Sequence, residues 1–196
     1  MIRLRCLAAG ALLLTAASAS AQALESFGLG ATVGLSNAVD RSFHLEEFKT
    51  RDRNLWVEYR AEENVLLRGT FGSMTVKGAN AGQAASVGGS PITLPDLRDK
   101  IDYATIGASY VFPERGWDTG LFAGIGGYKV NPDPVTPEIR NFRDRNETVW
   151  GFHVGVDADV QIWKRLSGVG RITFHRLQAH PHRSILTADL GLVYRF

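Results

Sequence analysis

Apolar residues alternate with small or polar residues along most of this chain, and this period of two limits its fold more than any other feature. Residues 27–36 (FGLGATVGLS) carry Phe, Leu, Ala, Val and Leu on one face and three glycines with Thr and Ser on the other. Glycine weakens an ordinary strand, but it suits the crowded interior of a narrow barrel. The pattern therefore favours a barrel whose apolar face points outward.

The same alternation recurs further along the chain, so the sequence predicts an all-β fold of eight antiparallel strands. The other segments are residues 55–60, 65–76, 103–112, 121–128, 150–161, 171–175 and 186–196. No segment after residue 21 has the roughly 18 consecutive apolar residues of a membrane helix. A closed barrel is the other structure that satisfies every backbone group in lipid.

The predicted connections alternate between short and long. The short ones are 62–64, 113–119 and 163–166; the long ones are 37–53, 77–99 and 131–147; the last, 177–183, is intermediate. Short turns at one rim and long loops at the other are typical of outer-membrane barrels. We therefore predict an eight-stranded, antiparallel, up-and-down transmembrane β-barrel with both termini on the periplasmic side. A soluble barrel of the lipocalin kind would need an apolar interior for its ligand.

The N-terminus has the pattern of a secretory signal peptide. Two arginines in the first five residues precede an apolar run, 6–17, and a small-residue triplet that ends at Ala21. This order predicts a signal peptide over residues 1–21 with cleavage after Ala21, or as a second choice after Ala23. The outer-membrane barrel domain then covers residues 22–196. The alternative is an N-terminal membrane anchor, although the apolar run is shorter than the roughly 20 residues of a spanning helix.

Composition narrows the functions expected of the mature chain. The formal net charge of +2 comes from two arginines of the signal peptide, so the mature chain has no basic surplus for nucleic acid. The single cysteine, Cys6, also lies in the signal peptide, which leaves no disulfide and no thiol nucleophile. We expect no nucleic-acid partner and no cofactor.

The last eight residues carry the most specific motif of the chain. Residues 189–196 (DLGLVYRF) and 105–112 (TIGASYVF) share the pattern polar-x-Gly-x-x-Tyr-x-Phe. Tyr and Phe two residues apart share one face of a strand, and aromatic rings suit the membrane interface. The terminal copy resembles the sorting signal that the barrel-assembly machinery recognises in outer-membrane barrels, with Gly191, Tyr194 and Phe196 as its signal residues.

Its strand number, Gly-rich first strand and terminal Tyr-x-Phe make the chain from Phe27 to Phe196 similar to the small OmpA/OmpX-type outer-membrane barrels. The resemblance implies localisation in the outer membrane, contact with its lipids and lipopolysaccharide, and contact with the barrel-assembly machinery during biogenesis. We expect no peptidoglycan-binding domain of the OmpA type, because the chain stops at Phe196. This fold hosts many functions, so envelope integrity, adhesion and ligand contact through the outer loops all remain open.

Strand parity places many charged and polar side chains inside the predicted barrel. The inward set is Glu58, Arg60, Arg68, His153, Asp157, Asp159, Gln161, Arg171, His175, Asp189 and Arg195. An eight-stranded barrel is just wide enough to be filled by side chains, and an isolated buried charge is very costly. We therefore expect a charge network that plugs the barrel. Its carboxylates are Glu58, Asp157 and Asp159, and its guanidiniums are Arg60, Arg68 and Arg171. The alternative is a narrow ion path gated by rearranging pairs.

An enzyme that acts on lipid is the main alternative function. The lipid A deacylase family, a group of outer-membrane barrel esterases, places a His and a Ser two apart near the outer rim, and His182 and Ser184 have this spacing. An esterase also needs a carboxylate to orient the His, and Asp189 or Glu147 could supply it. Ile185 stands where that family continues with Asn, so no catalytic residue is predicted.

The predicted outer connections offer few other sites. His180 and His182 are two apart, but no neighbouring Cys or carboxylate completes a metal site, so no metal is predicted. Basic residues in 37–53 and 131–147 could contact phosphates of lipopolysaccharide or an external ligand. Residues 79–90 are rich in Gly, Ala and Ser and are expected to be flexible.

Overall fold

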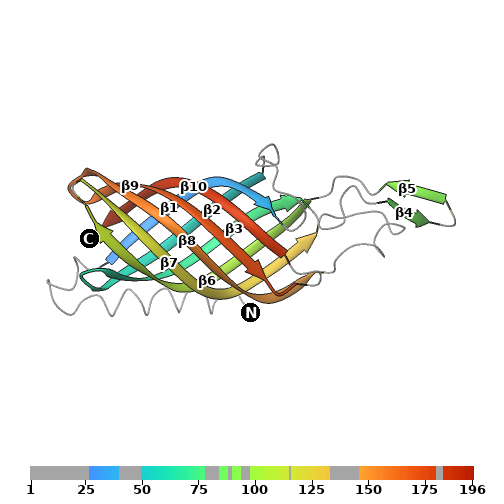
Figure 1. Cartoon of the computed structure of the whole chain (residues 1–196), viewed down its shortest axis with the longest axis horizontal. Coiled ribbons are helices and arrows are strands. Elements are labelled where there is room, and N and C mark those ends of the chain that lie inside the picture. Colours follow the sequence, from blue (N-terminus) through green and yellow to red (C-terminus); the bar gives the residue numbers. More distant parts are fainter. Residues whose placement is uncertain are drawn as a thin grey trace, which may run out of the picture.

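The alternating segments form a closed barrel of eight antiparallel strands (Figure 1). Its strands are β1 (Phe27–Ala38), β2 (Thr50–Glu62), β3 (Val65–Lys77), β6 (Arg98–Pro113), β7 (Trp117–Pro132), β8 (Glu147–Trp163), β9 (Leu166–Leu177) and β10 (Arg183–Arg195). The order around the barrel is β1-β10-β9-β8-β7-β6-β3-β2. Successive barrel strands therefore pair with each other, and β10 closes the barrel on β1. The predicted all-β, eight-stranded, up-and-down fold is confirmed.

The computed structural model describes residues 27–39, 50–77, 84–87, 90–93, 98–114, 116–132, 146–179 and 183–196. The predicted signal peptide, residues 1–21, lies outside these ranges. Within them, no helix is long and apolar enough to cross a membrane.

The two ends of the barrel differ in the connections that they carry. The tight connections of one end, which we call the short-turn rim, join β2 to β3, β6 to β7 and β8 to β9. At this rim the Phe196 amide donates a hydrogen bond to the Phe27 carbonyl at 2.9 Å. The opposite end, the long-loop rim, carries the longer connections, as the sequence predicted.

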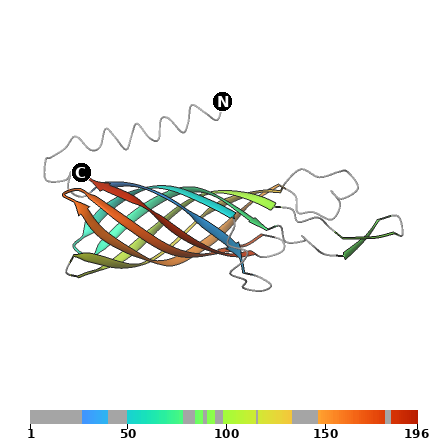
Figure 2. The same ribbon diagram turned by 90° about the horizontal axis from the view of Figure 1, so that it is seen from above.

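The strands extend further toward the long-loop rim than the alternation predicted. β1 continues to Ala38 and β2 begins at Thr50, so the first connection is shorter than the predicted 37–53. Part of the segment expected to be flexible forms a hairpin of β4 (Ala84–Val87) and β5 (Ser90–Thr93). This hairpin lies beyond the long-loop rim in both views (Figures 1 and 2). Backbone ladder hydrogen bonds do not depend on side-chain polarity, which explains why polar segments also pair.

Large apolar side chains cover the outward face of the barrel. Leu190 is 72% exposed, and Phe71 is 64% exposed. Contiguous apolar surface of this extent is unfavourable in water, but it suits contact with hydrocarbon. The barrel strands contain 12 to 17 residues. About 12 tilted residues at roughly 3.3 Å each reach across a hydrocarbon core of about 25–30 Å.

The barrel interior is narrow enough to require glycine on two strands. A Cβ on Gly30 would overlap the Trp56 indole, and a Cβ on Gly191 would overlap the backbone carbonyl of Ala31. The missing side chain leaves space for an inward neighbour in the first case and for close approach of two strands in the second. Tight packing of this kind is the reason for a Gly-rich inward face on residues 27–36.

Inward side chains form two layers of different chemistry. Charged and polar groups, with a small apolar cluster of Trp56, Val169 and Val193, fill the half nearer the short-turn rim. A larger apolar cluster, with buried polar groups such as Asp52 and Asp99, fills the half nearer the long-loop rim. The larger cluster, which we call the apolar cluster, consists of Met74, Val76, Ile101, Tyr103, Tyr128, Val130, Leu177, Ala179 and Ile185. The sequence analysis did not predict this apolar layer. Near the long-loop rim the alternation inverts, because the outward positions become polar and the inward positions become apolar.

Candidate functional site

Arg68 is the centre of a charge network that crosses the barrel. From β3, its guanidinium donates to Glu58 Oε2 on the adjacent β2 at 3.2 Å and to Asp157 Oδ2 on β8 at 2.8 Å. β3 and β8 are not neighbours in the sheet, so the second contact spans the interior. The three side chains are no more than 9% exposed. Each charge thus has the opposite charge that burial demands.

Arg195 extends this network toward the short-turn rim. Its guanidinium donates to Glu58 Oε1 at 2.8 Å and to Asp159 Oδ2 at 2.5 Å. The indole of Trp56 also donates to Glu58, at 3.2 Å. Glu58 therefore accepts hydrogen bonds from two cations and one neutral donor. Sequence parity placed Arg195 inside the barrel but did not single it out as a network member.

Arg171 extends the network toward the long-loop rim. It lies opposite Asp157 on β8 and Asp189 on β10 in the strand register. Its Nη2 is 3.8 Å from Asp157 Oδ2, and its guanidinium lies over the Trp56 ring at 4.3 Å from the centroid. A cation over an indole face is favourable, more so when water is excluded. Trp56 is 1% exposed and so contributes both a hydrogen bond and a ring face.

Arg60 does not join these contacts. Its Nη1 donates at 2.5 Å to the backbone carbonyl of Glu63, in the turn after β2. The register shifts between Arg60 and Glu62, and this irregularity separates the end of β2 from the interior layer. Of the predicted network, the structure brings together Glu58, Arg68, Asp157, Asp159 and Arg171, with Arg195 as the link to Asp159.

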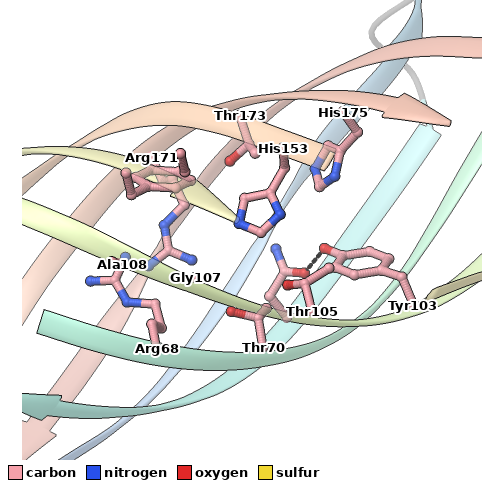
Figure 3. A pocket seen from close by; sticks show the side chains of 13 residues that line it. Arg68, Thr70, Tyr103, Thr105, Gly107, Ala108, His153, Arg171, Thr173 and His175 are labelled. Atoms are coloured by element: carbon pink, nitrogen blue, oxygen red, sulfur yellow. Dashed lines mark hydrogen bonds between the residues drawn. The ribbon is translucent and has the colours of Figure 1, made fainter. Parts of the chain in front are cut away.

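A small cavity lies beside the network, toward the apolar cluster (Figure 3). The side chains labelled around it include Arg68, Thr70, Tyr103, Thr105, His153, Arg171, Thr173 and His175. Tyr103 donates a hydrogen bond to Asn54 at its edge. The cavity measures about 20 Å³, which is room for about one water molecule and far below the volume of a ligand pocket.

A buried ion pair closes the interior at the long-loop rim. Arg183 on β10 donates to Asp99 Oδ2 on β6 at 2.5 Å, and the side chains are 3% and 2% exposed. β10 and β6 stand on opposite sides of the closed sheet, so this pair reaches across the barrel. Together with the apolar cluster, it obstructs the half of the interior that the charge network does not fill.

An open vestibule of about 490 Å³ lies at the short-turn rim. Asp159 and Arg195 line it and also belong to the charge network. A second small cavity further inside, beside Glu58 and Arg68, measures about 20 Å³. The short-turn rim is therefore open as far as Arg195, whose side chain is 27% exposed and pairs with Glu58 and Asp159.

Comparison with known families agrees with this architecture. The chain matches the model of the outer membrane protein beta-barrel domain over residues 9–196. The chain belongs to the outer membrane protein beta-barrel domain family. It is accordingly an outer-membrane protein, and the apolar outward face is its lipid-facing surface. A sequence search of curated proteins found no significant match.

Solved structures of other outer-membrane barrels share this fold at low sequence identity. Neisserial surface protein A (NspA) superposes with a TM-score of 0.62 at 13% identity, over 87% of this chain and 97% of that chain. The N-terminal barrel domain of Pseudomonas aeruginosa OprF gives 0.55 at 9% identity, over 87% and 98%. Ail, the attachment invasion locus protein of Yersinia pestis, in complex with the heparin analogue sucrose octasulfate, gives 0.54 at 14% identity, over 87% and 98%. These similarities show the fold alone.

The C-terminal motif, residues 189–196, ends at the short-turn rim of the barrel. Tyr194 and Phe196 are each 43% exposed on the lipid-facing surface, with ring centroids 5.2 Å apart. The internal copy on β6 has the same arrangement, with 5.0 Å between the rings of Tyr110 and Phe112. The two copies differ in topology, because the terminal one lies on the strand that closes the barrel. The role of Gly191, Tyr194 and Phe196 in assembly stays a prediction.

The residues considered for ester hydrolysis do not share one face. Ser184 lies opposite Arg176 on the outward face, and its hydroxyl accepts a hydrogen bond from that guanidinium. Asp189 and Glu147 lie on the inward face. The sheet therefore separates both candidate carboxylates from Ser184, and neither can serve as the acid of a triad there. His182 lies outside the described residues.

The described residues also hold no group of three or more His, Cys, Asp or Glu side chains arranged to bind a metal ion. His153 and His175 are close, with ring centroids 5.8 Å apart. They line the one-water cavity, where His175 Nδ1 lies 3.1 Å from the Tyr128 hydroxyl. Their arrangement is that of packed polar side chains between the charge network and the apolar cluster. His180, in the other candidate pair, lies outside the described ranges.

Proposed function

We propose that this protein is a sealed outer-membrane barrel that acts through its outer surface, in envelope structure or in contact with partners, and not by conduction or catalysis. The observation that carries the proposal is the filled interior. Ion pairs occupy one half, an apolar cluster occupies the other, and the Asp99–Arg183 pair crosses the long-loop end.

The energetics of the two layers support a seal. An ion that passed the first layer would have to displace Arg68 from Glu58 and Asp157, and breaking one buried pair costs about 3–5 kcal/mol. It would then meet side chains such as Ile101 and Leu177, which are fully buried. Hydrophobic constrictions block ions by excluding water. Two barriers of different chemistry in series favour a plug over a gated path.

The orientation of the barrel supports a role at the outer surface. Outer-membrane barrels place short turns in the periplasm and long loops outside. The long-loop rim of this protein, with the β4–β5 hairpin beyond it, would then face the exterior. The exterior is where envelope contacts, adhesion or an outer-loop ligand would act.

Conductance measurements test the sealed interior. The mature chain, refolded in detergent and checked for heat-modifiable mobility, should give no stable unit conductance in planar bilayers. Arg68→Ala should also stay closed, because the apolar cluster and the Asp99–Arg183 pair remain. Stable unit conductance that changes with Glu58→Ala or Arg68→Ala would replace the plug with an ion path.

A hydrolysis assay tests the absence of catalysis. The refolded protein should release no fatty acid from lipid A or from model esters, and Ser184→Ala should behave like the wild type. The opposite faces of Ser184 and the two candidate carboxylates support this expectation. Turnover that Ser184→Ala abolishes would establish an esterase in place of an interaction barrel.

A further inference from the structure

Two buried aspartates flank Gly34 in the barrel interior. Gly34 on β1 is the register partner of Asp52 on β2 and of Asp189 on β10. The three residues therefore lie at one height on adjacent strands, and the two aspartates are 1% and 3% exposed. Asp52 lies in the predicted connection 37–53, so strand parity did not place it inside the barrel.

The missing side chain of Gly34 leaves room for the two carboxyl groups to meet. A Cβ on Gly34 would lie 2.2 Å from Asp189 Oδ1, so this oxygen lies over β1. From there the carboxyl group of Asp189 contacts that of Asp52 directly. Because β10 and β2 are not paired with each other in the sheet, the contact connects two strands that the backbone ladder does not join.

Each carboxyl group has one satisfied and one unsatisfied oxygen. Asn54 donates to Asp52 Oδ2 at 3.1 Å, and Thr187 donates to Asp189 Oδ2 at 3.2 Å. Among the residues that the structure describes, the Oδ1 atom of each aspartate is buried without a hydrogen-bond partner. An ionised carboxyl group only accepts hydrogen bonds, so two ionised groups in contact cannot satisfy each other.

The titratable neighbours do not supply the missing partner. Arg171 on β9 is the register partner of the β10 aspartate, but it also lies opposite Asp157 and is shared between the two carboxylates. Tyr103 on β6 faces the pair as well, but its hydroxyl donates to Asn54. Within the described ranges, no ion pair includes Asp52.

We infer that Asp52 and Asp189 bind one proton between them, and that this shared proton joins β2 to β10 across β1. Two carboxyl groups in contact cannot both ionise at low cost. With one proton, the neutral group donates to the ionised one, and the contact becomes a strong, charge-assisted hydrogen bond. A metal ion fits less well, because Ca²⁺ takes about six to eight oxygen ligands and the described residues offer no group of three or more ligating side chains.

The proton site lies at the seam that closes the barrel. The ladder between β1 and β10 joins the two ends of the sheet, and closure brings the two carboxyl groups together there. The shared proton therefore adds a side-chain link over three strands at the seam. The sealed interior depends on other side chains, namely Arg68, the apolar cluster and the Asp99–Arg183 pair. The inference thus goes beyond the proposed function and can fail without it.

Infrared spectroscopy of the refolded mature chain in lipid vesicles tests for the proton. At neutral pH the wild type should show the carbonyl stretch of a protonated carboxyl group, shifted in D₂O. Asp52→Asn and Asp189→Asn should each abolish this band, because the amide then donates in place of the proton. Asp159→Asn is the matched control, since Asp159 also points inward but pairs with Arg195. This variant should keep the band.

Amide hydrogen exchange, followed by mass spectrometry, tests the link across the seam. Asp52→Ala removes the hydrogen bond, so the amides of β1 and β10 should exchange about ten-fold faster than in the wild type. Asp52→Asn keeps a donor and should exchange at the wild-type rate. Amides of β7, on the opposite side of the closed sheet, should not change. If the Asp52 variants lose heat-modifiable folding, Asp189→Asn and Asp189→Ala replace them.

Four results would overturn the inference. The first is a folded wild type without the protonated-carboxyl band, and the second is a band that survives both Asn substitutions. The third is equal exchange at the seam in Asp52→Ala and Asp52→Asn, which would remove the link between the strands. The fourth is a bound metal ion, detected by native mass spectrometry and removed by a chelator, which would assign the carboxyl pair to a cation.

Discussion

Replacing Arg68 by methionine tests the interior network most directly. Methionine keeps much of the side-chain volume but removes the cation from Glu58 and Asp157. Removing one partner of a buried ion pair destabilises a protein by about 3–5 kcal/mol. We expect the lower end, about 3 kcal/mol, because Glu58 keeps Arg195 at 2.8 Å and Asp157 keeps Arg171 at 3.8 Å.

Arg60→Met is the matched control for this change. It is the same substitution on the neighbouring strand, but Arg60 contacts the Glu63 carbonyl in the turn and not a carboxylate. We expect its effect on the free energy of unfolding to stay within about 0.5 kcal/mol. Urea titration of each variant in lipid vesicles, followed by tryptophan fluorescence, measures the difference, and Trp56 lies beside the altered layer.

A double-mutant cycle with Asp157→Asn isolates the contact that crosses the barrel. Arg68 and Asp157 are 2.8 Å apart, so we expect a coupling free energy of about 1–2 kcal/mol between the two substitutions. Equal destabilisation by Arg68→Met and Arg60→Met, or additive effects of Arg68→Met and Asp157→Asn, would contradict the network as described.

Three further perturbations give expected outcomes of different kinds. Deleting Phe196 should slow assembly into the outer membrane, whereas Phe112→Ala in the internal copy of the motif should not slow it. The amount of heat-modifiable protein in membrane fractions measures assembly in both variants. Gly30→Ala should destabilise the barrel by about 1–3 kcal/mol, because its Cβ meets the Trp56 indole. Gly127→Ala should not destabilise it, because a Cβ there meets nothing within 4 Å. Urea titration measures the free energy of unfolding of both variants. Asp99→Asn should lower stability by about 3 kcal/mol, because it removes the negative charge that Arg183 meets at 2.5 Å in a buried ion pair. Planar bilayers should still record no conductance, because the apolar cluster remains.

The barrel itself was predictable because lipid imposes a strict pattern on sequence. Every outward position within the hydrocarbon must be apolar, so the period of two appears directly in residues such as those of segment 27–36. The alternation of short and long connections then indicated the two rims. Where the strands rise above the lipid this constraint ends, and for that reason the extension of β2 to Thr50 and the β4–β5 hairpin were not predicted.

The apolar cluster was missed for a related reason. At the long-loop end the outward face is polar and the inward face is apolar, which is the pattern of a barrel in water. Segments such as 73–77 on β3 therefore show the inverted alternation. The signal was present in the sequence as a change of phase between Phe71 and Lys77, where the outward residues pass from apolar to polar.

The sequence by itself determined the fold, the two rims and the face of each side chain within the predicted strands, because each of these follows from strand parity and loop length. Only the tertiary structure decided which inward charges meet. Arg68 reaches Asp157 across 89 positions of sequence, and Arg195 reaches Glu58 across 137. Parity assigns a side chain to a face but not to a height along the barrel. Register and closure set that height. They bring Arg195 into the network, whereas the Arg60 side chain donates to the Glu63 carbonyl in the turn.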